Sequence, residues 1–154
     1  MHPDTATSSS SGREVFFWNV NNPVGHNGVN QMDDVLFVSW CIYKAAKHPD
    51  LPFELRGVFK DAGLTHMCDG TKDHRLVTAI YALQRAFGRG GLVDGRISPA
   101  KGVTYAHHRA KHIYMIFELN SYLRVMHPEH YPRIDLMPEF PWKLKQFALA
   151  PFIS

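Results

Sequence analysis

Three histidines late in the sequence are the first residues whose types and spacing could do chemistry. His107, His108 and His112 form an HHxxxH pattern, and a helix would place the last two on one face. Zinc enzymes use histidines at this spacing, with a glutamate between them as the base. Here the intervening residues include two cations, Arg109 and Lys111, which oppose metal binding. We therefore expect a solvated, partly packed helix start and no metal site.

Cys68 is a second candidate, because His66 and His74 lie near it in the sequence. A His-x-Cys pair with one distant histidine is not a recognised closed zinc site. A cysteine nucleophile needs a histidine base that a third group orients. Asp69 is better explained as a turn residue, since it precedes Gly70. We expect neither a cysteine hydrolase nor a cofactor here.

The remaining chemical groups show no recognisable arrangement. Four acids stand at no spacing typical of a glycosidase pair: Asp69, Asp94, Glu118 and Asp135. The GRGG glycines at 88–91 end a predicted helix, whereas a phosphate loop would begin one. Phe16, Phe17 and Trp18 could stack on sugars, but packing is the expected role of such a run. The sequence therefore predicts a protein that is not an enzyme.

The elements that position these groups centre on the stretch 68–102. Apolar residues recur at helical spacing between Leu76 and Phe87, which predicts a helix over 73–87 with Asp73 as its N-cap. An Asp-Gly pair lies on each flank, Asp69-Gly70 and Asp94-Gly95. Such pairs favour tight turns, because glycine accepts a positive φ angle. One amphipathic helix is thus expected between two turns.

Two further helices are predicted. The first covers 31–47 and is apolar nearly all round, which is typical of a central helix. Its predicted N-cap is Asn30, with Asp33 as the acid of a capping box. The other covers 105–126, and its inward face carries Asn120, which we expect to be buried and bonded to a loop carbonyl.

The other segments are shorter. A short helix is predicted within 137–147, and residues 51–60 form either a helical turn or an extended arm. The aromatic segment 14–20 could be a strand, but the absence of an obvious partner strand favours an extended packing arm. Residues 1–13 are polar and rich in serine, so we expect a disordered tail.

The order of these motifs resembles the peptidoglycan-binding domain family, a small helical module of cell-wall enzymes. The family core contains Asp-Gly, Ala-Ile, an apolar residue with Gln, and a second Asp-Gly followed by Pro. The matching residues are Asp69-Gly70, Ala79-Ile80, Leu83-Gln84, Asp94-Gly95 and Pro99, preceded by Val24-Gly25, Asn30, Asp34-Val35 and Val38. The chain departs from the family pattern at Asp73, Leu76 and Ser39, where the family usually has Gly, Thr and Gln.

This resemblance implies a mainly α fold, a three-helix bundle over 24–104 with a helical extension over 105–154. Together they would form one domain, 14–154. The implied function is noncatalytic binding of peptidoglycan, with Gln84, Asp94 and Arg96 as polar groups near the groove. Similar extensions occur on such modules in proteins linked to bacterial type VI secretion. The alternatives are a protein-interaction module that lost the glycan ligand (an adaptor, chaperone or immunity factor), an enzyme with an unrecognised site, and a purely structural subunit.

Composition limits the partners. The net charge of +3 is mild and the cations are scattered, which is not the footprint of a nucleic-acid-binding protein. No segment approaches the roughly 20 apolar residues that span a membrane. The first residues do not resemble a secretory signal, so we expect a protein that is cytoplasmic as synthesised. Action in the periplasm would then require signal-independent export.

Overall fold

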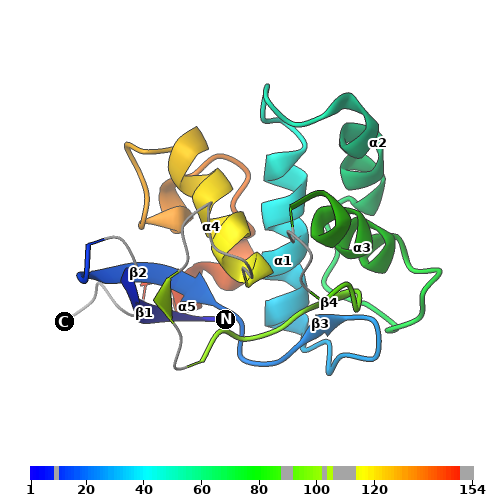
Figure 1. Ribbon diagram of the computed structural model, residues 1–154, viewed down its shortest axis with the longest axis horizontal. Coiled ribbons are helices and arrows are strands. Elements are labelled where there is room, and N and C mark those ends of the chain that lie inside the picture. Colours follow the sequence, from blue (N-terminus) through cyan, green and yellow to red (C-terminus); the bar gives the residue numbers. More distant parts are fainter. Residues whose placement is uncertain (9–10, 88–91, 102–103, 106–113, 150–154) are drawn as a thin grey trace.

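The computed structural model describes residues 1–8, 11–87, 92–101, 104–105 and 114–149 (Figure 1). Helix α1 stands at the centre, with α2 and α3 on one side and α4 on the other (Figure 1). The α-helices are α1 (Met32–Ala45), α2 (Phe53–Ala62), α3 (Arg75–Phe87), α4 (Met115–Met126) and α5 (Lys145–Leu149). Two short 3-10 helices, η1 (Ile134–Leu136) and η2 (Trp142–Leu144), join α4 to α5.

Two small sheets complete the fold. In the first, β1 (His2–Ser8) lies between β2 (Glu14–Asn19) and β5 (Thr104–Tyr105). Strands β1 and β2 are antiparallel, with His2 opposite Asn19, whereas β5 runs parallel to the end of β1. The second sheet pairs β3 (Val24–Gly25) with β4 (Arg96–Ile97) in antiparallel fashion. The second sheet lies beside α1 and α3 and holds the second Asp-Gly turn.

The expected mainly α three-helix bundle with a helical extension is wrong, because the chain has a mixed α/β fold. The predicted disordered tail is wrong for His2–Ser8, which form β1. The segment 14–20 is not an isolated arm, because β1 is its partner strand. Pro3 fits in β1 because, within the described part of the chain, β5 pairs with Thr7 and Ser8 at the far end of β1, and no second strand there needs the missing N–H of Pro3. The apolar surface that this pair of strands packs into the core comes from β2, where Phe17 and Trp18 are buried.

The two helices predicted in the first part of the chain are confirmed as α1 and α3. The capping box of Asn30 and Asp33 is wrong, since Gln31 stands at the N-cap of α1 without a side-chain cap bond. Asn30 instead adopts a φ of 56° and organises the preceding loop. Its side chain accepts from Gly25 N at 2.7 Å and donates to Gly25 O at 3.0 Å.

The helix predicted over 105–126 begins later, because Tyr105 belongs to β5 and α4 starts at Met115. Residues 51–60 form most of α2 rather than a single turn, and the helix predicted within 137–147 corresponds to η2 and the start of α5. Among the described residues, no helix combines the length and the apolar character needed to cross a membrane.

One hydrophobic core, from Met1 to Ala148, takes residues from every helix and from β1, β2, β3 and β4. Asn120 of α4 is fully buried within it, as expected, but its partner is a strand rather than a loop. The Asn120 amide donates to Trp18 O and its oxygen accepts from Trp18 N, both at 2.8 Å. The side chain thus covers the outer edge of β2 with the same pair of bonds that another strand would make.

Candidate functional site

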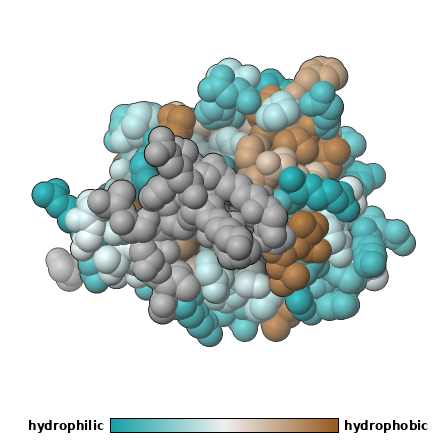
Figure 2. Space-filling view, in the orientation of Figure 1, coloured by the Kyte–Doolittle hydropathy of each residue, from teal (hydrophilic) through white to brown (hydrophobic). Residues whose placement is uncertain are grey.

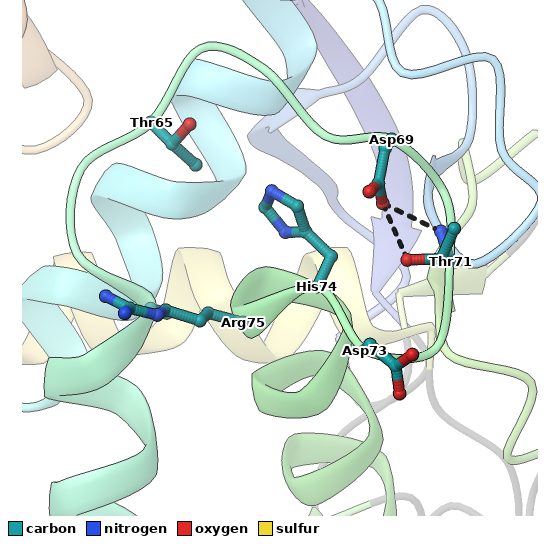
Figure 3. A pocket seen from close by; sticks show the side chains of 7 residues that line it. Thr65, Asp69, Thr71, Asp73, His74 and Arg75 are labelled. Atoms are coloured by element: carbon teal, nitrogen blue, oxygen red, sulfur yellow. Dashed lines mark hydrogen bonds between the residues drawn. The ribbon is translucent and has the colours of Figure 1, made fainter.

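A polar hollow lies where the chain leaves α2 and enters α3 (Figure 3). Its volume is about 450 Å³, and its lining residues are Ala62, Thr65, Asp69, Thr71, Asp73, His74 and Arg75. A second hollow of about 320 Å³ shares Asp73 and Arg75 and continues along α2 and α3. The loop that carries the first Asp-Gly pair therefore forms one wall of a hollow large enough to hold a small ligand.

The first Asp-Gly turn fixes this wall. Oδ1 of Asp69 accepts from the backbone N–H and the hydroxyl of Thr71, both at 2.9 Å (Figure 3). Gly70 has a φ of 75°, as a tight turn of this kind requires, and its carbonyl accepts from Asn27 N at 3.0 Å. The bonds from Thr71 lower the pKa of Asp69, so this carboxylate is ionised at neutral pH.

His74 caps α3 from the floor of the hollow. Leu76 N donates to His74 Nδ1 at 3.2 Å, and Thr78 N donates to His74 O at 3.0 Å. The N-cap assigned to Asp73 is therefore wrong, because the following residue fills that role. The His74 ring points between Thr65 and Asp69, whereas the Asp73 carboxylate points away from it (Figure 3).

The hollow thus presents groups of both signs. Asp69 supplies a carboxylate, Asp73 supplies a second one where this hollow meets the neighbouring hollow, and Arg75 supplies a guanidinium on the opposite side (Figure 3). Thr65 is tied to the loop, because its hydroxyl donates to Met67 O at 2.9 Å. Such a lining suits a polar ligand that carries both an amino group and a carboxylate.

Gln84, Asp94 and Arg96, predicted from the resemblance to lie at a groove, do come together, but at the β4 turn. Gln84 Nε2 donates to Asp94 Oδ1 and to Arg96 O, each at 3.0 Å. Gln84 Oε1 accepts from Gly95 N at 2.8 Å, and the Asp94 carboxylate lies 3.3 Å from the Arg96 guanidinium. Gln84 is 5% exposed, so most of the hydrogen-bonding groups of its side chain are used in holding this turn against α3.

Burial raises the pKa of Asp94, but the bonds from Gln84, then from the Arg96 backbone and guanidinium, outweigh it. The net effect is a pKa below the ordinary value, so Asp94 is ionised in the folded protein. Gly95 beside it has a φ of 74°, which confirms the positive φ expected of the second Asp-Gly turn.

The candidate catalytic groups do not assemble among the described residues. No group of three or more His, Cys, Asp or Glu side chains in that part of the chain could hold a metal ion. Burial raises the pKa of the Cys68 thiol, which keeps it protonated and weakly nucleophilic. Phe17 and Trp18 are buried and cannot stack on a sugar. His107, His108 and His112 lie outside the described residues.

Sequence reasoning missed Thr65, Thr71 and Arg75 as lining residues of the hollow. The available signal was an Asp-Gly-Thr turn close before a helix start, because backbone amides converge there.

In comparisons with protein families, curated proteins and solved structures, nothing matches this chain.

Proposed function

We propose that this chain is a noncatalytic module that binds peptidoglycan, with the hollow at the start of α3 as its contact site. The observation that carries the proposal is the polar hollow of about 450 Å³, built on the first Asp-Gly turn. This volume falls within the range of about 300–1,000 Å³ that ligand pockets occupy. A role in a bacterial wall-targeting or type VI secretion system belongs to the same proposal and rests on the resemblance.

The lining groups suit the stem peptides of peptidoglycan, which carry amino and carboxylate groups. Asp69 and Asp73 can accept from an amine, and Arg75 can pair with a carboxylate. The departures from the family pattern have different consequences here. Leu76 is fully buried and serves packing, whereas Asp73 lines the hollow and adds a charge to it.

Binding without catalysis agrees with the state of the nearby groups. The Cys68 thiol has a raised pKa, and Nδ1 of His74 is occupied as the cap of α3. A nucleophile paired with an oriented base is therefore missing from this part of the described structure. An open polar hollow with few charged contacts supports modest affinity, roughly micromolar, or about 8 kcal/mol.

Co-sedimentation with purified sacculi tests this function. The wild-type protein is expected to pellet with sacculi and to release no muropeptides above a heat-denatured control. Asp69→Asn removes a charge but retains an oxygen that can accept from Thr71, so it should weaken pelleting without unfolding the turn. Arg75→Gln should weaken it as well, whereas the exposed Asp50→Asn should not. Absence of pelleting, or release of muropeptides by the native protein alone, would contradict the proposal.

A protein-interaction module is the second candidate, favoured by an apolar hollow on another part of the surface. This hollow, of about 270 Å³, is lined by Met32, Asp33, Leu36, His66, Lys143, Leu144 and Phe147. Trp142 beside it is 75% exposed. Hydrophobic residues also gather near α2 and α3 on the face shown in Figure 2. If sacculi do not bind, a protein captured by the wild type but not by Phe147→Ala would favour this candidate.

A further inference from the structure

The turn that directly follows α4, over residues 127–132, makes hydrogen bonds to β2. The carbonyl of Pro132 accepts from the indole N–H of Trp18 at 2.9 Å. The Tyr131 hydroxyl lies 3.3 Å from the carbonyl oxygen of Phe16. Two residues of β2 therefore depend on the position of this turn for hydrogen bonds.

His127 determines where the turn begins. Its backbone N–H donates to Leu123 O at 2.9 Å, and this bond ends α4. Its carbonyl accepts from His130 N at 3.1 Å and from Tyr131 N at 3.0 Å. A displacement of His127 therefore displaces the turn that carries the bonds to β2.

The surroundings of the His127 ring suit its neutral form. The side chain is 16% exposed, and Nε2 is buried without a hydrogen-bond partner among the described residues. A neutral ring can place a lone pair at this nitrogen, whereas a protonated ring carries an N–H there that reaches no acceptor in the described part of the chain. A buried donor without a partner is costly, and a buried charge is more so.

The charged groups around the ring come from three parts of the fold. Lys44 of α1 is buried and acts on His127 as a like charge, while Glu139 attracts Lys44 and offsets part of that charge. Within the turn, Oε1 of Glu129 lies 3.5 Å from His127 Nδ1 and 3.6 Å from His130 Nε2. One carboxylate is thus shared by two imidazole rings.

The net effect of these surroundings is to keep the ring uncharged. Burial, and then the charge of Lys44, lower the pKa of His127, and Glu129 opposes them only in part. The neighbouring His130 lowers this pKa further when it is protonated. The neutral ring therefore predominates at pH 7, and a fall in pH brings the charge into this place.

We propose that the 127–132 turn is a pH-sensitive clamp on β2, which loosens when His127 takes up a proton. The charged ring moves towards water and away from Lys44, and the turn moves with it. The indole N–H of Trp18 then loses its bond to Pro132. Because the pKa of His127 is lowered by folding, the clamp is fully stable above about pH 6.5, the ordinary histidine value, and weakens below it.

A nuclear magnetic resonance titration of the full chain from pH 8 to pH 5 tests the clamp. The ring protons of His127 should titrate with a midpoint below about 6.5. The protection of the Trp18 indole N–H against solvent exchange should fall over the same range, by up to about tenfold per pH unit. Both signals belong to the wild type, so this test does not depend on whether any variant folds.

Variants separate the clamp from a purely structural turn. Lys44→Met should raise the His127 midpoint and Glu129→Gln should lower it, because the two charges act on the ring with opposite sign. His127→Gln should abolish the pH response of Trp18, and His130→Gln should retain it. A His127 midpoint at or above 6.5, constant Trp18 protection while His127 titrates, or an unchanged response in His127→Gln would overturn the proposal.

Discussion

Gly95 is the residue at which backbone conformation matters most directly. Its φ is 74°, and an added Cβ would lie 2.5 Å from Cε2 of Tyr81. A side chain in the left-handed conformation costs about 1–2 kcal/mol, and the overlap with Tyr81 adds to it. Gly95→Ala should therefore lower the free energy of unfolding by more than about 1 kcal/mol, as measured with urea.

Gly57 is the matched control, because it lies inside α2 and a Cβ there would meet nothing within 4 Å. Gly57→Ala should stabilise the protein by about 0.5–1 kcal/mol, since alanine has the higher helix propensity. If both substitutions change stability equally, Gly95 does not hold a left-handed conformation in its turn.

Asn120 provides a second test at this scale. It accepts from Trp18 N and the Tyr131 hydroxyl, each at 2.8 Å, and donates to Trp18 O. Asn120→Ala removes the partner of the buried Trp18 N–H and C=O groups and should cost about 2–4 kcal/mol in urea unfolding. Asn22→Ala, which removes only an exposed bond to Gln31, should change stability by less than about 0.5 kcal/mol.

The conformation and the burial of a residue could be predicted where they depend on its neighbours in the sequence. Both Asp-Gly turns follow from two adjacent residues. Burial and pairing of Asn120 follow from its place in an apolar stripe, but its partner does not, since Trp18 lies 102 positions away. The Asp-Gly-Thr turn before α3 marks the place of the hollow, but Arg75 could not be predicted to line it, because its place there depends on how α2 packs against α3.

At the scale of elements, two adjacent residues at the start of α3, Asp73 and His74, differ in whether they cap the helix. His74 accepts from Leu76 N, whereas no hydrogen bond of the Asp73 side chain occurs in the described part of the chain. His74→Ala should cost about 1 kcal/mol of unfolding free energy, and His74→Asn should restore most of it. Asp73→Ala should cost at most about 0.5 kcal/mol, through the helix dipole. A larger loss from Asp73→Ala than from His74→Ala would reverse the assignment.

Helices were more predictable than strands for a physical reason. Helical hydrophobic spacing is local, so α1 and α3 could be read from their own residues. Strand β1 has few apolar side chains, and what makes it a strand is backbone pairing with β2 and β5. The polar sequence HPDTATS therefore predicted disorder, although a partner strand follows within a few residues.

For the whole molecule, acid should weaken the fold. The Asp135 carboxylate accepts two bonds from Arg133, at 2.8 and 2.7 Å, which lower its pKa, and the pKa of Asp94 is lowered as well. A lowered pKa contributes stability that is present above the unfolded-state pKa and is lost as the pH falls through the folded-state value.

The free energy of unfolding should therefore decline as the pH falls from about 5 towards 2. Asp94→Asn and Asp135→Asn should each make this decline shallower, while Asp50→Asn at an exposed site should leave its slope unchanged. Urea unfolding at a series of pH values measures the slope. A decline that both substitutions leave untouched would mean that these pairs do not contribute to stability.

The most direct measurement of the central claim is a nuclear magnetic resonance titration of the labelled protein with a purified disaccharide-tetrapeptide from peptidoglycan. Saturable shifts are predicted at the backbone amides of Thr71, His74 and Arg75, around the hollow, and Arg75→Gln should weaken them. Shifts confined to Gln84, Asp94 and Arg96 would place the ligand at the β4 turn and contradict the assigned site. No shift at any residue would contradict peptidoglycan binding itself.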